Sequence, residues 1–257
     1  MVVLFSITLI LQLVLIASFT ITPQTHLQQS NGHNRIRTTN TKLHSLKPAA
    51  IPLLDSGKAL ARSGELLIDY TSTSEYNLYA GGLSNTGASI RNAGDCVAQA
   101  AASMRFKTAG ELVCDELREA ATCISEGNNE KLPKGVDDAN VDGYSVLAGN
   151  IEGLIPSMEC VGLQLEMAGE RIMKRDTVAN IGSCLVESGE CLQALALGIQ
   201  KLGDEFDVGV EENTKSIEAV KLSSNRMLFA AEKMKEAGNN LKGVQPPKKK
   251  GKSWLKG

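Results

Sequence analysis

Apolar residues recur every three or four positions over long stretches of this chain, as Leu185, Leu192, Leu195 and Ile199 illustrate. That spacing gathers them on one side of an α-helix and predicts that this side is buried. Proline is absent from 53–132 and from 157–245, so both stretches are free to form long helices. The pattern predicts an all-α fold, an antiparallel bundle of long helices.

A short motif recurs within these stretches: a small residue, a glycine, then Asp, Glu or Asn, any residue, and an aliphatic one. It occurs six times, beginning at residues 63, 93, 109, 168, 188 and 237, and four copies have a second glycine seven residues upstream of the first. Seven residues are two helical turns, so the paired glycines share a face. Glycine costs about 1 kcal/mol relative to alanine inside a helix, which close approach of a neighbouring backbone offsets. We predict Gly/Ala-rich helix seams at Gly57, Gly64, Gly87, Gly94, Gly162, Gly169, Gly182 and Gly189; the competing interpretation is that these glycines break short helices.

The motifs also indicate an internal duplication. Residues 85–100 resemble 180–194 at an offset of 95, and 57–65 resemble 162–170 at an offset of 105. Two related helical units therefore account for most of the chain. Around them we predict a signal-like apolar segment at 1–19, a transit-like disordered leader at 20–50, helical unit 1 at 51–127, a linker at 128–143, helical unit 2 at 144–206, a C-terminal helix at 207–243 and a basic tail at 244–257.

Local signals place the ends of these elements. The linker is rich in turn formers, including Pro133 and several Gly, Asn and Asp residues. We expect a break near residues 106–108, one helix over 144–174 and a helix N-cap at Asp176. Gly243, just before Pro246 and Pro247, is the expected stop of the last helix.

The N-terminus has the composition of a targeting sequence. Residues 2–19 are mostly apolar, and residues 20–54 are rich in Thr, Ser, Asn and Gln, carry only basic charges and hold all three histidines. This order resembles the bipartite presequence of algae with red-lineage secondary plastids, with Ala17-Ser18-Phe19 at the signal cleavage junction, although the fuller Ala-Phe-Ala-Pro context is absent. The resemblance implies import into the plastid stroma. Secretion, or a membrane anchor formed by residues 2–19, are the alternatives.

The overall net charge of −2 conceals an uneven distribution of charge along the chain. Residues 55–245 carry 29 acidic and 18 basic side chains, and five lysines follow in the last ten residues. The tail residues Lys248, Lys249, Lys250, Lys252, Trp254 and Lys256 fit an anionic surface, with Trp254 at the interface. A protein partner or an anionic membrane is the predicted target, and no nucleic acid is expected because aromatic residues do not alternate with the lysines.

No recognised catalytic or metal-binding motif stands out. The segment 51–257 contains no histidine, and none of its six cysteines forms Cys-x-x-Cys. The acidic run from Asp137 to Asp142 lacks the glycine and glutamate that an EF-hand loop requires. Most cysteines fit a small apolar core. Cys96 and Cys191, equivalent in the two units, are the candidate disulfide if the units pack about a pseudo-twofold axis.

The sequence therefore predicts a non-catalytic structural or interaction protein that needs no cofactor. Two other classes stay open. A lipid or hydrophobic-ligand binding protein would hold a large apolar cavity between its helices, and a secreted disulfide-linked helical protein would pair its cysteines. Oligomeric state and the identity of any partner are not encoded in a recognisable motif.

Overall fold

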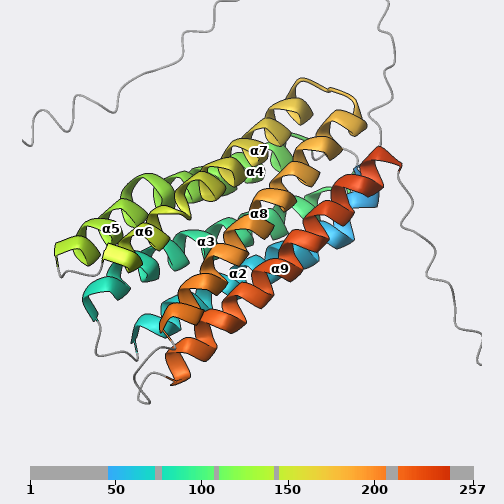
Figure 1. Cartoon of the computed structure of the whole chain (residues 1–257). Coiled ribbons are helices and arrows are strands. Elements are labelled where there is room, and N and C mark those ends of the chain that lie inside the picture. Colours follow the sequence, from blue (N-terminus) through green and yellow to red (C-terminus); the bar gives the residue numbers. More distant parts are fainter. Residues whose placement is uncertain (1–45, 73–76, 107–109, 142–144, 207–213, 244–257) are drawn as a thin grey trace, which may run out of the picture. The chain divides into compact units, whose positions relative to one another are not determined.

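The computed structural model describes residues 46–72, 77–106, 110–141, 145–206 and 214–243 (Figure 1). Within these ranges every regular element is helical, which confirms the all-α prediction. The elements are α2 (Lys47–Ser72), α3 (Asn77–Ser103), α4 (Gly110–Glu126), the π-helix η1 (Gly127–Lys131), α5 (Leu132–Val141), α6 (Ser145–Glu152), α7 (Ile155–Met173), α8 (Val178–Phe206) and α9 (Thr214–Lys242).

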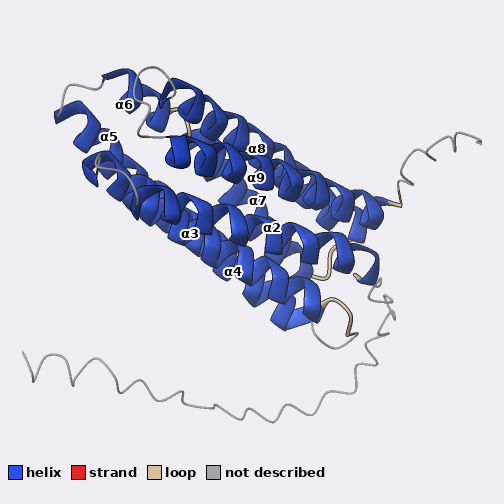
Figure 2. Ribbon diagram, turned by 90° about the horizontal axis from the view of Figure 1, so that it is seen from below, coloured by secondary structure: helices blue, strands red, loops and turns tan. Residues whose placement is uncertain are grey.

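Six long helices form a closed ring in the order α2, α3, α4, α7, α8, α9. Each packs against the next, and α9 returns to pack against α2. Contacts show that α2 and α9 are antiparallel, since Ser56 bonds to Ala230 and Ser63 to Ser223. The glycine contacts between α2 and α3 and between α8 and α9 run in the same opposed order. Figure 2 shows the helices running along a common direction, with the short α5 and α6 together at one end. The predicted antiparallel helical bundle is confirmed at this level.

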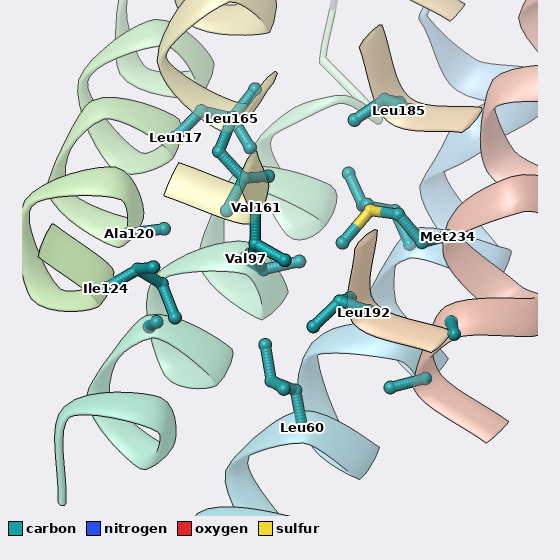
Figure 3. Close-up of a cluster of buried hydrophobic side chains, with 14 of the residues drawn as sticks. Leu60, Val97, Leu117, Ala120, Ile124, Val161, Leu165, Leu185, Leu192 and Met234 are labelled. Atoms are coloured by element: carbon teal, nitrogen blue, oxygen red, sulfur yellow. The ribbon is translucent and has the colours of Figure 1, made fainter. Parts of the chain in front are cut away.

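The core lies inside the ring and receives side chains from all six helices (Figure 3). On α4 the buried residues Val113, Leu117, Ala120 and Ile124 recur at helical spacing. Alternation of large and small residues lets neighbouring layers interdigitate. The core side chains labelled in the close-up are Leu60, Val97, Leu117, Ala120, Ile124, Val161, Leu165, Leu185, Leu192 and Met234.

Polar groups also join the ring where α2 meets α9. The Ser63 hydroxyl donates to the Ser223 carbonyl oxygen at 3.0 Å, and the Ser223 hydroxyl donates to the Ser63 carbonyl oxygen at 2.9 Å. Further along the same contact, the Ser56 hydroxyl donates to the Ala230 carbonyl oxygen at 2.8 Å. All three serines are fully buried, so each hydroxyl would carry a desolvation cost without its partner. These small residues let the two helices meet through their backbones.

Helix ends follow local chemistry, with small differences from the sequence predictions. Thr177, rather than Asp176, accepts the backbone N–H of Asn180 at the start of α8, while Asp176 accepts the N–H of Thr177. Gly243 adopts a φ of 72° immediately after α9, as expected of a glycine C-cap. The break expected near 106–108 lies between α3 and α4, and residues 107–109 are outside the described ranges.

Two predicted boundaries are wrong. The predicted helix over 144–174 is divided by a turn at Gly153 and Leu154, after which Pro156 sits in the first turn of α7, where its missing N–H is tolerated. The predicted 128–143 linker is helical up to Val141. It forms η1 and α5, and Pro133 lies in the first turn of α5, where its missing N–H is tolerated.

The folded helices begin slightly earlier than the predicted first unit. Helix α2 starts at Lys47, inside the segment assigned to the leader, and Leu46, Ala49 and Ala50 are buried. The rest of the leader and the tail at 244–257 lie outside the described residues. Among the helices that the structure describes, none is both long and apolar enough to span a bilayer.

Candidate interaction surface

The bundle carries opposite charge on opposite helices. Helix α4 has five carboxylates and one arginine, and α7, its neighbour, has three carboxylates and one arginine. Helix α9 has six basic side chains against three carboxylates. In the ring order given above α4 stands three positions from α9 in either direction, so the most acidic and most basic helices lie across the core from each other. The molecule is therefore electrically polar across its width.

A surface depression of about 450 Å³ lies on the acidic side, where α4, η1 and α7 meet. Three carboxylates line it, from Glu126 on α4, Glu130 on η1 and Glu166 on α7, and all three residues are exposed. Arg118 is the basic residue of the lining. The remaining lining residues are small or polar: Ala121, Thr122, Ser125 and Asn129. We call this set of residues the acidic depression.

The π-helix contributes to the wall of the depression. Glu126, Asn129 and Glu130 are three and four positions apart, a spacing that places them on one helix face, and all three line the hollow. Gly127 lies on the buried side of η1. A Cβ added there would lie 2.5 Å from Met158 Cε and 3.0 Å from Ser89 Cβ. π-Turns are rare and occur frequently at functional sites. The segment predicted to be a loop is therefore helical and presents the Glu130 carboxylate to the depression.

Burial and neighbouring carboxylates both act on Glu116 of α4, which is outside the lining of the acidic depression. Partial burial raises the pKa of Glu116, and the neighbouring carboxylates of Glu119 and Asp115 raise it further. On α7, by contrast, hydrogen bonding and charge from Lys174 lower the pKa of the Glu170 carboxyl group.

The structure places the eight glycines at contacts between successive antiparallel helices. On α2 and α3, a Cβ at Gly57 would lie 2.7 Å from the Gly94 carbonyl oxygen, and one at Gly87 would lie 2.8 Å from the Gly64 carbonyl oxygen. On α8, Gly182 faces the backbone of Gly238 and Gly189 faces that of Ala231, both on α9. Gly162 and Gly169 on α7 face α4 less tightly, at 3.6 Å from the Ala121 carbonyl oxygen and 3.1 Å from that of Cys114.

The predicted Cys96–Cys191 disulfide is wrong. Cys191 on α8 is bonded to Cys160 on α7, with a Cα–Cα distance of 5.8 Å, and Cys96 is a free thiol. The error comes from the assumed symmetry axis: α3 and α8 are not neighbours in the ring, so equivalent positions on them do not meet. Cys160 was not singled out by the sequence, because only knowledge of which helices are neighbours identifies it as the partner.

The acidic depression was not predicted from the sequence. Carboxylates at exposed helical positions are usually a solvated face, and one of the contributing segments was interpreted as a linker. The available signal was the imbalance on 110–126, which has five carboxylates and one arginine. The predicted tail site at Lys248, Lys249, Lys250, Lys252, Trp254 and Lys256 lies outside the described residues. Within the described ranges, no group of three or more metal-ligating side chains converges.

No protein-family model, curated protein or solved structure matches this chain.

Proposed function

We propose that this protein is a non-catalytic helical interaction module that binds a basic protein segment through the acidic depression on α4, η1 and α7. The observation that carries the proposal is the convergence of Glu126, Glu130 and Glu166, from three different elements, on one hollow with a single lining arginine. A lysine- or arginine-rich segment supplies the complementary charge. The concave wall of small polar residues offers hydrogen-bond partners for its backbone.

The ring supports this function by holding the three carboxylates in place. Helices α4 and α7 contact each other through Gly162 and Gly169, and the disulfide between Cys160 and Cys191 ties α7 to α8. A rigid wall lowers the entropic cost of binding, because its side chains start from elements that are already ordered. We further propose that the paired helices derive from an internal duplication, with the glycine contacts as the retained packing feature.

A synthetic peptide of residues 244–257, which is basic, is a suitable probe for the depression. We expect it to bind the protein lacking its own tail, and to bind less tightly as salt concentration rises. The triple variant Glu126→Gln, Glu130→Gln, Glu166→Gln removes three exposed ion-pair partners, so affinity should fall roughly tenfold. Isothermal titration calorimetry or fluorescence anisotropy measures this change directly.

A matched variant separates local recognition from net charge. Glu187, Glu190 and Glu218 are exposed on α8 and α9, and their replacement by glutamine removes the same amount of negative charge from another part of the ring. Peptide affinity should then change less than twofold, since long-range effects of exposed charges are screened. Equal losses of peptide affinity in the two triple variants would show that binding depends only on the net charge of the protein. The proposed site would then be wrong.

We also propose that the leader directs the chain to a plastid and is removed during import. Because Leu46, Ala49 and Leu53 are buried in the core, cleavage should leave them in the mature chain and fall between about Phe19 and Leu46. N-terminal sequencing or intact-mass analysis of the native protein tests this. A native chain that starts at Met1 and is extracted only with detergent would instead support the membrane anchor.

A further inference from the structure

The outer sides of α2 and α9 carry large apolar side chains that are exposed to solvent. Ile51 on α2 is 64% exposed, and Leu222 and Phe229 on α9 are 44% and 43% exposed. Leu222 and Phe229 are two helical turns apart, so they share one side of α9. Met227 and Met234 are fully buried on its inner side. Two neighbouring helices thus present apolar groups outward.

Basic side chains lie among these apolar ones. Lys58 and Arg62 are exposed on α2, and Arg226 is exposed on α9, within one turn of both Leu222 and Phe229. Among the residues that the structure describes, no carboxylate pairs with Lys58 or Arg226. These two cations are therefore available to an anionic partner. We call the set of Ile51, Lys58, Arg62, Leu222, Arg226 and Phe229 the α2–α9 face.

The buried serine contacts hold the two halves of this face side by side. Those hydrogen bonds span residues 56–63 of α2 and 223–230 of α9. Lys58 falls within the first range, and Arg226 and Phe229 fall within the second, so all three lie at the same level along the bundle. Because all three are exposed, they lie on the outer side of the α2–α9 contact.

The charge of the two helices suits an anionic partner. Helix α9 has an excess of basic side chains, as described above, and α2 has three basic and three acidic ones. The carboxylates of Glu65 and Glu236 are paired with basic side chains of their own helices, Arg62 and Lys233. Lys233 also lies over the Phe229 ring, 5.7 Å from its centroid, which adds a cation beside the apolar group.

The basic tail starts at one end of the same face. Near the end of α9, the Asn240 side-chain amide donates to the Pro48 carbonyl oxygen at the start of α2, at 3.0 Å. Residues 244–257 follow directly and contain five lysines and the pair Trp254-Leu255. They are joined to the bundle beside the α2–α9 face. An anionic surface that attracts the tail would therefore also be close to the face.

We propose that the α2–α9 face docks on the surface of a lipid bilayer that contains anionic lipids. Ile51, Leu222 and Phe229 enter the boundary between headgroups and acyl chains, while Lys58 and Arg226 meet lipid phosphates. A bilayer suits this face because a fluid surface accepts apolar side chains that are separated by charged ones, whereas a protein interface favours an apolar centre with few charges. The face lies on other helices than the acidic depression and is independent of it.

A tryptophan placed on the face tests the proposal. The chain has one tryptophan, Trp254, so the full-length variant Phe229→Trp, Trp254→Phe reports on α9 alone. On vesicles of equal parts phosphatidylcholine and phosphatidylglycerol, its emission should shift to shorter wavelength, and brominated lipid chains should quench it, because the indole leaves water. Phosphatidylcholine vesicles should cause neither effect at the same lipid concentration. Adding Lys58→Gln and Arg226→Gln should raise the lipid concentration for half-maximal quenching about tenfold.

Two further variants complete the experiment. Ile51→Trp with Trp254→Phe reports from α2 and should behave as the Phe229→Trp variant does. The matched control is Leu112→Trp with Trp254→Phe, because Leu112 is 58% exposed on α4, across the ring from α9. Its emission should change little on either vesicle.

Three results would overturn the proposal. The first is that anionic vesicles quench neither reporter on the face, and the second is that they quench the Leu112→Trp control equally. The third is that phosphatidylcholine vesicles quench the Phe229→Trp variant as strongly as anionic ones do. A shift of its emission that grows with protein concentration without lipid would instead show that a second copy of the chain covers the face, which also contradicts the proposal.

Discussion

Replacing Gly94 with alanine should destabilise the protein by about 3 kcal/mol or more, although alanine is the better helix former. A Cβ at this position would lie 2.7 Å from the Gly57 carbonyl oxygen and 2.8 Å from Ala61 Cα. Both atoms belong to the backbone of α2, so the clash is relieved only by moving one helix away from the other. Denaturant unfolding followed by circular dichroism measures the change in the free energy of unfolding.

Replacement of a second glycine by alanine should have the opposite effect on stability. Gly149 is exposed in α6, and a Cβ added there would meet no atom within 4 Å. Gly149→Ala should stabilise the protein by about 0.5–1 kcal/mol, because alanine restricts the unfolded chain without meeting a neighbour. If Gly94→Ala behaves like Gly149→Ala, α2 and α3 do not approach as closely as the structure shows.

The double variant Cys160→Ala, Cys191→Ala should lose about 2–4 kcal/mol of stability, since the bond closes a loop between residues 31 positions apart. The melting temperature should fall by roughly 5–15 °C for a body of this size. Reducing agent supplies the internal control. Once the native protein is fully reduced, its stability should approach that of the double variant, because neither chain then carries the crosslink.

The reverse pattern would count against the disulfide. A difference between native protein and double variant that persists undiminished in reducing agent would assign the loss to the missing sulfur atoms in the packed core. Mass mapping under non-reducing conditions distinguishes the two explanations independently, because it identifies the peptide that joins Cys160 to Cys191.

Much of the helical structure was predictable because its causes are local. The spacing of Leu185, Leu192, Leu195 and Ile199 sets the buried face of α8, and Gly243 ends α9 through its own left-handed conformation. The 127–141 segment was misread for the same reason: its Gly, Asn and Pro residues favour turns by themselves. In the structure Gly127 lies against Met158 and Ser89, and this contact joins parts of the chain far apart in sequence, so no local signal shows it.

The sequence by itself determined that this chain is helical, that its last helix stops at Gly243, and that residues 55–245 carry an excess of negative charge, because periodicity, this cap and charge are local properties of the residues. Only the tertiary structure decided which helices are neighbours. That order pairs Cys191 with Cys160 rather than Cys96, and brings Glu126, Glu130 and Glu166 to one depression. The physical reason is that helix faces of similar apolar composition can pack in several orders, and the choice rests on the combined fit of the whole core.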